Sequence, residues 1–158
     1  MHVHDGSLVG TGLKIAMVVS RFNSLVTEAL LSGAVDTLRR HGVTEEDLEV
    51  FRCPGTFELG PLLSRAARSG KYDAVIALGA IIRGGTPHFD FVAAETVKAV
   101  AQVAMEAECA VSLGVLTTDS MEQALERAGL KAGNKGGEAA AAAIEQASLL
   151  KQLGLTSR

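Results

Sequence analysis

The sequence has 158 residues, of which 47% are hydrophobic and 21% charged, and its net charge at pH 7 is −3. These values are typical of one globular domain with a sizeable core, and they give no electrostatic reason to expect a nucleic-acid partner. No apolar run approaches the roughly 18 residues needed to cross a bilayer. The N-terminus lacks the basic and apolar regions of a secretory signal, and the two cysteines provide no disulfide framework. We therefore expect a single cytoplasmic domain over residues 1–158.

Strand and helix patterns alternate along the chain. Short runs rich in Val, Ile and Leu predict four strands, at residues 13–20, 48–53, 73–79 and 110–118. Segments with one apolar face predict helices over 27–42, near Pro61, over about 90–108, between Ser120 and Gly129, and over about 137–153. Such alternation is typical of a three-layer α/β/α fold, in which helices cover both faces of a four-stranded parallel sheet.

Residues 1–12 do not fit this alternation, because they contain few apolar side chains and several glycines. Two interpretations are open. The segment is either a loose N-terminal tail or a strand that pairs with the sheet edge of another chain. His2 and His4 lie within it, and no further ligands are evident that would make them a metal site.

Ligands of parallel α/β sheets bind beyond the carboxyl ends of the strands. The loop LGAIIRGGTPHFD, residues 78–90, follows one such end and nearly has the spacing of a P-loop, but Gly85 stands where a P-loop has its lysine. Gly84, Gly85 and Thr86 would still offer backbone N–H groups and a hydroxyl to an anion at a helix N-terminus. The missing lysine argues against a nucleoside triphosphate and favours a phosphate ester. A plain glycine-rich turn is an equally good interpretation of this loop alone.

Other strand ends carry groups that suit a flat, hydroxylated substrate. His88 is a candidate for proton transfer, although an isolated loop histidine is more often a surface residue. Phe22 and Asn23 would stack on a heterocycle and bond its edge; the alternative is a core phenylalanine followed by a helix N-cap. Glu58 would accept hydrogen bonds from hydroxyls, or would simply complement a helix dipole.

Two cations lie late in the chain. Arg127 falls in the last turn of a short predicted helix, where a cation is favoured in any case, and Lys135 lies in the loop GNKGG. Both would complete an anion site if they reached one. Sequence spacing does not show that they reach the Gly84–Thr86 loop of the same subunit.

Several long segments together resemble the lumazine synthase family. They match in order, from about residue 6 to about residue 153: VVSRFN, PGTFEL, KYDAVIALGAIIRGGTPHFD, GVLTTD, EQALERAG and GNKGGEAA. The resemblance implies a flavodoxin-like fold and a transferase that needs neither metal nor organic cofactor. The implied reaction is the penultimate step of riboflavin biosynthesis. It condenses 5-amino-6-(D-ribitylamino)uracil with 3,4-dihydroxy-2-butanone 4-phosphate to 6,7-dimethyl-8-ribityllumazine, phosphate and water.

The resemblance also implies a role for each matched residue. His88 would be the catalytic proton-transfer residue. The phosphate substrate would be held by Gly85, Thr86, Arg127 and Lys135. The ribitylaminouracil would be held by Phe22, Asn23, Thr56, Phe57, Glu58, Ala80, Ile81, Ile82 and Leu113.

The family further implies a homopentamer, in some members built into a hollow icosahedral shell, with each active site between adjacent subunits. Leu113, Arg127 and Lys135 would come from the neighbouring subunit, and residues 1–12 would join its sheet. The short connection RAGLKAGNKG is compatible with a shell, and riboflavin synthase is a further candidate partner. Leu113 stands where members often carry an aromatic residue, so we expect lower affinity for the heterocycle.

Competing functions are less consistent with these residues. A catalytically weak shell that binds flavin or lumazine would not need His88, Thr86 and Arg127, and only Leu113 favours it. A relative that dismutates the lumazine would not need a phosphate cradle. A flavodoxin-type electron carrier would need an FMN-binding loop after the first strand, which SRFNS does not resemble.

Overall fold

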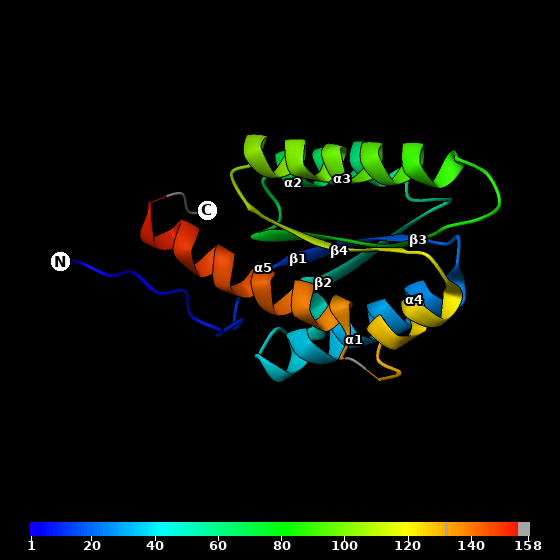
Figure 1. The fold of residues 1–158 in the computed structure, drawn as a ribbon. Coiled ribbons are helices and arrows are strands. Elements are labelled where there is room, and N and C mark those ends of the chain that lie inside the picture. The colour runs from blue at the N-terminus through cyan, green and yellow to red at the C-terminus, as the bar shows by residue number, and fades with distance from the viewer. Residues whose placement is uncertain (132, 155–158) are drawn as a thin grey trace.

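The computed structural model describes residues 1–131 and 133–154, so Ala132 and residues 155–158 of the predicted domain lie outside this description. Its four strands are β1 (Ile15–Ser20), β2 (Leu48–Cys53), β3 (Ala74–Ile82) and β4 (Ala110–Thr118). They form one sheet in the order β2-β1-β3-β4, and every pairing is parallel (Figure 1). The predicted four-stranded parallel sheet is confirmed.

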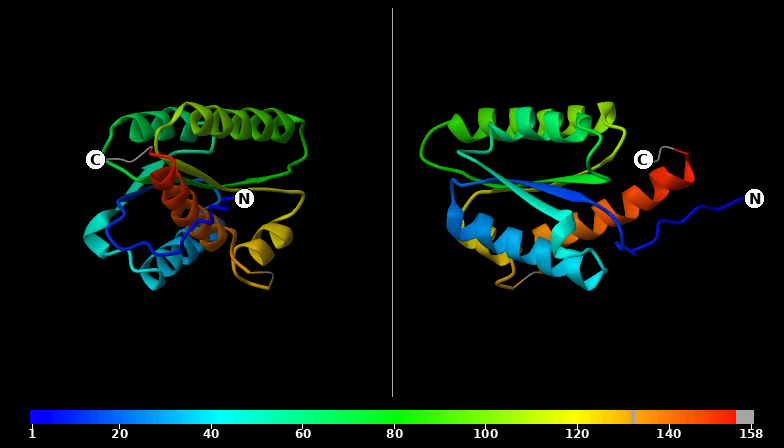
Figure 2. Two further views of the ribbon diagram at one scale, coloured as in Figure 1. Left: turned by 90° about the vertical axis from the view of Figure 1, so that its left-hand side faces the viewer. Right: turned by 180° about the vertical axis from the view of Figure 1, so that it is seen from behind.

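Five α-helices cover the two faces of the sheet. Figures 1 and 2 show α2 (Leu59–Arg68) and α3 (His88–Glu106) on one face, with α1 (Ser24–Arg40), α4 (Met121–Arg127) and α5 (Lys135–Gln152) on the other. A short 3-10 helix, η1 (Glu45–Asp47), precedes β2. The three-layer α/β/α, flavodoxin-like architecture is therefore confirmed. Among the described helices, none combines the length and hydrophobicity that a bilayer crossing requires.

The predicted helix over 27–42 is observed over Ser24–Arg40, and two further differences from the predicted boundaries surround the glycine-rich loop. β3 continues three residues beyond Gly79 to Ile82, because this stretch pairs with Leu116–Thr118 of β4. The next helix, α3, begins at His88 instead of Asp90. The connection is thereby reduced to residues 83–87, so the glycines lie between a strand end and a helix N-terminus, and His88 is the first residue of that helix.

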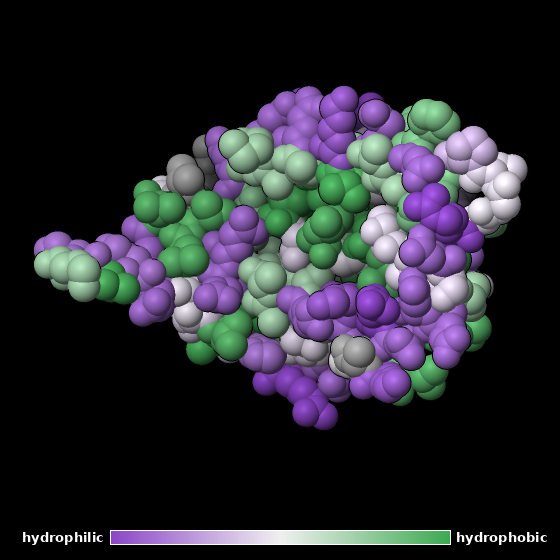
Figure 3. All heavy atoms as spheres, in the orientation of Figure 1, coloured by the Kyte–Doolittle hydropathy of each residue, from purple (hydrophilic) through white to green (hydrophobic). Residues whose placement is uncertain are grey.

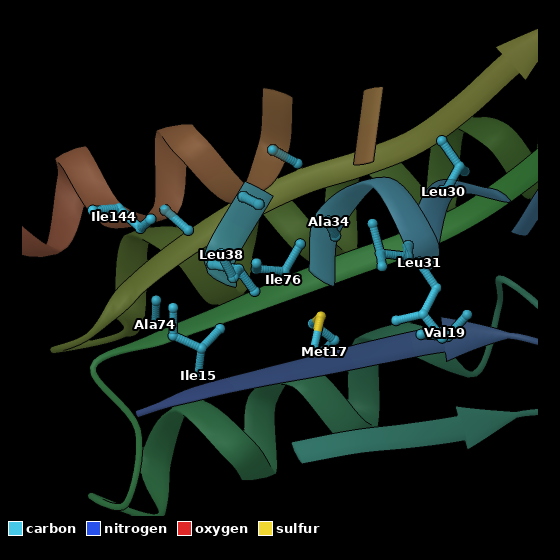
Figure 4. Close-up of a cluster of buried hydrophobic side chains, with 14 of the residues drawn as sticks. Ile15, Met17, Val19, Leu30, Leu31, Ala34, Leu38, Ala74, Ile76 and Ile144 are labelled. Atoms are coloured by element: carbon cyan, nitrogen blue, oxygen red, sulfur yellow. The ribbon is translucent and has the colours of Figure 1, made fainter. Parts of the chain in front are cut away.

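Two apolar clusters pack on opposite faces of the sheet. Because side chains alternate along a strand, Ile15, Met17 and Val19 belong to one cluster, whereas Ala16 and Val18 belong to the other. Figure 4 shows the first set beside side chains of α1 and α5, namely Leu30, Leu31, Ala34, Leu38 and Ile144. β1 is fully buried along its length, as expected for a central parallel strand.

The N-terminal segment leaves the body beside the C-terminal part of α5 (Figure 2). Residues 1–9 form no regular secondary structure. The Ser7 N–H donates to the Ser148 hydroxyl over 3.0 Å, and the Gln152 amide donates to the Asp5 carbonyl over 2.9 Å. In the single chain the segment is thus an extended tail, and its pairing with another subunit stays a prediction.

The helices α1 and α5 pack unusually closely through glycine and one asparagine. The Asn134 side chain caps α5 by accepting from the N–H groups of Gly136 and Gly137, at 2.9 and 3.1 Å. Its amide donates to the carbonyls of Ala29 in α1 and Ala128, at 2.9 and 3.0 Å. All the hydrogen-bonding capacity of one half-buried side chain is used to join three segments.

Replacing Gly136 with alanine should destabilise the fold. An added Cβ would lie 2.0 Å from the Leu30 carbonyl oxygen, so α1 and α5 would have to move apart. Overpacking costs about 1–3 kcal/mol, and we expect the upper end or more because the obstacle is backbone. Urea unfolding followed by circular dichroism measures the loss. Gly84→Ala is the control, since a Cβ there meets nothing within 4 Å; equal unfolding midpoints would contradict the prediction.

Candidate functional site

The turns that follow the four strands lie at one edge of the sheet, and backbone hydrogen bonds join them. The Arg21 N–H donates to the Cys53 carbonyl over 2.8 Å, and the Phe22 N–H donates to the Pro54 carbonyl over 3.1 Å. The Arg83 N–H donates to the Thr118 carbonyl over 2.9 Å. The strand ends are therefore fixed relative to one another before any side chain is considered.

An open cleft of about 690 Å³ lies at this edge. It contains ten of the residues that the sequence predicts for the site: Phe22, Asn23, Thr56, Phe57, Glu58, Ala80, Ile81, Ile82, Thr86 and His88. Gly55, Gly84, Phe89, Phe91, Val92 and Glu95 also line it, whereas Gly85 lies in the loop between two lining residues. Folding thus gathers residues from three strand ends around one hollow.

Asn23 lines the cleft between the end of β1 and the start of α1. It is the one described residue other than glycine with a positive φ, at 61°, a conformation that asparagine tolerates better than most residues. Its side chain makes no cap hydrogen bond to α1 and instead donates to the Ala80 carbonyl over 2.9 Å. The N-cap alternative is therefore wrong for the side chain, because the left-handed turn directs it across to β3.

Phe22 and Phe57 are exposed aromatic rings on the cleft wall. Phe22 is 70% exposed and Phe57 is 66% exposed, so the alternative of a core phenylalanine at position 22 is wrong. Exposed rings of this size beside polar groups are typical of ligand contacts, because an aromatic face gains from stacking on a planar partner.

The PGTFE turn places a carboxylate at the cleft. Thr56 is buried against Gly79, where a Cβ would come within 2.7 Å of the threonine methyl. Glu58 occupies the residue before α2, and its carboxylate lies over Gly55. Burial, and to a lesser extent the Glu58 charge, raises the pKa of the Cys53 thiol. The Cys53 thiol therefore stays protonated and is a poor nucleophile.

The Gly84–Thr86 loop opens directly into α3. A Cβ at Gly84 or Gly85 would meet nothing within 4 Å, so the backbone here is open to a ligand. The nineteen residues of α3 begin at His88, and the partial positive charge of the helix N-terminus faces the same region. An anion at this loop would meet backbone N–H groups, a hydroxyl and an imidazole together.

Arg83 is a residue that the sequence reasoning missed. Its guanidinium donates to Asp119 over 2.8 Å and to Asp90 over 3.2 Å, and lies 4.3 Å from the ring centroid of Phe89. The hydrogen bond to Asp119, reinforced by Asp90, raises its pKa above the ordinary value. The Asp90 carboxylate, in the first turn of α3, accepts from Arg83 and makes no side-chain cap hydrogen bond to the helix. The signal was an arginine directly before two glycines.

Leu113, Arg127 and Lys135 do not line the cleft. Leu113 and Lys135 line a second hollow of about 670 Å³ between β4 and α5. Figure 3 shows hydrophobic surface gathered along this part of the molecule. The Lys135 ammonium lies 2.5 Å from the Glu138 carboxylate, and the Arg127 guanidinium donates to the Gln123 carbonyl over 3.1 Å. One chain therefore separates the predicted residues into two groups.

The described residues contain no group of three or more His, Cys, Asp or Glu side chains arranged to hold a metal ion. The cleft instead combines aromatic faces, backbone groups, the carboxylates of Glu58 and Glu95, and a glycine-rich loop. This set of groups suits binding and proton transfer on an organic phosphate.

A family model and individual known proteins that resemble this chain carry the same description. Residues 12–151 match the family model described as 6,7-dimethyl-8-ribityllumazine synthase. Proteins of that name from Anaeromyxobacter dehalogenans (strain 2CP-C) and Chlorobaculum tepidum are 71% and 58% identical to the chain. The alignments cover 97% of this chain and 94% of the first relative, and 94% of this chain and 96% of the second. The chain therefore belongs to the 6,7-dimethyl-8-ribityllumazine synthase family.

Proposed function

We propose that the protein condenses 5-amino-6-(D-ribitylamino)uracil with 3,4-dihydroxy-2-butanone 4-phosphate to 6,7-dimethyl-8-ribityllumazine, in the penultimate step of riboflavin biosynthesis. One observation carries the proposal beyond family membership. Phe22, the end of β3, Glu58 and the Gly84–His88 segment all line or border the same cleft. A flat heterocycle, a polyhydroxyl chain and a phosphate each find a matching group there.

The free edge of β3 supports recognition of the uracil ring. β1 pairs with β3 only as far as Leu78, whereas β3 continues to Ile82. Successive strand residues direct their backbone groups to opposite edges, so those of Ala80 and Ile82 face the cleft, whereas those of Ile81 face β4. Within the part of the chain that the structure describes, no strand pairs with this stretch on the cleft side, where the Ala80 carbonyl accepts from Asn23. These groups would read the polar edge of the uracil while Phe22 stacks on its face.

The ribityl chain would lie along the turn at residues 56–58. A carboxylate accepts hydrogen bonds at several lone pairs, so Glu58 would bind two hydroxyls at once. Thr56 and Phe57 would supply a hydroxyl and an apolar contact for the same chain. The proposed direction of the substrate is thus from β3, under Phe22, toward the start of α2.

The chemistry needs little more than proximity and proton transfer. The 5-amino group of the uracil attacks the ketone carbon, and loss of the first water from the carbinolamine gives an imine. Phosphate then leaves, stabilised by the Gly85–Thr86 loop and the N-terminus of α3. Ring closure with loss of a second water completes the product. His88 would move protons in these steps, and orientation of the two substrates would provide much of the rate.

The second group of residues would complete the site from a neighbouring subunit. Leu113 and Lys135 line their own hollow, and neither they nor Arg127 line the cleft of the same chain. A homopentamer in which β4 and α5 of one subunit face the cleft of the next would bring both groups together. Leu113 would then contact the heterocycle, and Arg127 and Lys135 would contact the phosphate.

The sheet edge supports a place for the N-terminal tail in such an assembly. β2 is an edge strand, and its Val50 and Phe51 side chains are substantially exposed. A strand from residues 1–12 of a neighbour would cover that edge. Assembly of pentamers into an icosahedral shell, a riboflavin synthase partner and a cytoplasmic location remain predictions from the family resemblance.

Purified protein should form lumazine from the two substrates faster than the uncatalysed reaction. We expect turnover to fall several-fold in His88→Ala, because proton relay is lost while both substrates stay oriented. It should fall further in Arg127→Ala, because the leaving phosphate loses its cationic partner. Lumazine absorbance and fluorescence measure both. Arg40→Ala, which removes an exposed arginine paired with Asp36, is the control. Absence of turnover with the uracil still bound would contradict the proposal.

Mixed assemblies test whether the site is shared. Coexpression of His88→Ala with Arg127→Ala chains should restore activity, because random mixing leaves about a quarter of the contacts in a cyclic oligomer with both residues intact. Coexpression of His88→Ala with Glu58→Ala is the matched control, since both residues line the cleft of one chain and no mixed site is complete. Equal activity of the two mixtures would rule out a shared site.

Leu113→Phe should tighten binding of the ribitylaminouracil. An aromatic face against the heterocycle adds about 0.5–1.5 kcal/mol, which lowers the KM for the uracil by about two- to tenfold. Leu113 is 46% exposed in the single chain, so the larger ring meets no packed core. Leu113→Met is the control, because it changes the apolar side chain without adding a π-face. A KM that falls equally in both variants would show that ring stacking is not the cause.

A further inference from the structure

Arg83 has no part in the proposed reaction, yet it makes the most elaborate side-chain contacts near the cleft. Two other segments contact its guanidinium, the turn after β4 and the first turn of α3. Asp119 follows β4, Asp90 belongs to the first turn of α3, and Phe89 stacks against the guanidinium plane. Among the described residues, Arg83 is the one cation within 4.0 Å of either aspartate. Two negative charges and one positive charge thus form a trio with a net charge of −1.

The trio lies beside the proposed phosphate loop. Arg83 directly precedes Gly84, and Asp90 follows Thr86 by four residues. Three residues span at most about 10 Å of backbone, so the Arg83 and Thr86 backbones are separated by no more than about one Debye length, which is roughly 8–10 Å. Charges in the trio are therefore felt by an anion bound at residues 84–86.

Asp90 would otherwise compete with the phosphate. A carboxylate in the first turn of a helix draws on the same partial positive charge that attracts an anion to that terminus. Asp119 adds a second negative charge from the neighbouring turn. The pairing with Arg83 offsets both, and the Phe89 ring holds the guanidinium in place without using its N–H donors.

We propose that Arg83 is a positioning residue for phosphate recognition, which neutralises Asp90 and Asp119 so that the Gly84–Thr86 loop accepts a dianionic phosphate. The inference rests on the proposed function, because it deepens the role of the same loop. It assigns Arg83 no contact with substrate. Its effect is on the affinity for the phosphate-bearing substrate and not on the affinity for the uracil.

Charge-changing variants separate neutralisation from a mechanical role. Arg83→Met changes the net charge of the trio from −1 to −2, Asp119→Asn changes it to 0, and the double variant restores −1 without any Arg83 ion pair. Arg68→Met is the matched control, because Arg68 pairs with Glu106 at the opposite end of α3. Titration with inorganic phosphate, followed by ³¹P NMR, gives the Kd, and initial rates give the KM of each substrate.

Arg83→Met should raise the phosphate Kd and the KM for the butanone phosphate about fivefold at low salt, with the KM for the uracil unchanged. The double variant should return to within about twofold of the wild type, because the net charge is restored. Asp119→Asn should bind phosphate more tightly than the wild type, and this arm stands even if Arg83→Met fails to fold. Added salt should shrink every difference.

The opposite results are equally specific. A double variant as weak as Arg83→Met would show a mechanical clamp, and equal effects of Arg83→Met and Arg68→Met would show general destabilisation; each overturns the inference. Wild-type protein that does not bind inorganic phosphate overturns it as well. Lumazine formation by the wild type reports separately on the proposed function, so a phosphate Kd that follows the trio charge without turnover would leave the Arg83 inference standing alone.

Discussion

The hydrogen bond from the Asn23 amide to the Ala80 carbonyl spans the place where β3 outlasts its neighbour β1. The rest of the cleft depends on this mismatch in strand length. A β1 as long as β3 would cover the edge of residues 80–82, and a β3 as short as β1 would supply no edge. The left-handed conformation of Asn23 ends β1 abruptly and starts α1, which leaves Phe22 on the cleft wall instead of in the core.

Much of this arrangement could be predicted from the sequence, because local patterns determine it. β2 and β4 begin and end where their apolar runs do. The predicted end of β3 was wrong because a glycine inside a strand pattern usually weakens or ends the strand. The Gly79 backbone is instead paired with β4, and the absence of a side chain there leaves room for Thr56. Pairing across strands is a tertiary property, and no single segment shows it. The Arg83 contacts with Asp90 and Asp119 were missed for the same reason.

The residues that line the cleft could be predicted from the sequence more closely than the ends of the strands and helices. Residues that follow strands β1 to β3 meet in one cleft because parallel strands end at the same edge of the sheet. Leu113, Arg127 and Lys135 obey no such rule. Leu113 lies within β4 and not beyond its end, and the other two flank the α4–α5 connection. In the proposed pentamer their distance from a cleft would be set by how subunits dock, which neither local pattern nor the isolated chain determines.

The four hydrogen bonds of Asn134 have a consequence for those two cations. They join the α4 end, which carries Arg127, to the α5 start, which carries Lys135, and they fasten both to α1. The backbone positions that carry the two cations are therefore held in a fixed relation to each other and to α1. In the proposed pentamer, any rotation between subunits would move Arg127 and Lys135 together toward or away from the phosphate in the neighbour's cleft. The relative orientation of the subunits would thus set the affinity for the anion, without any change in the charges themselves.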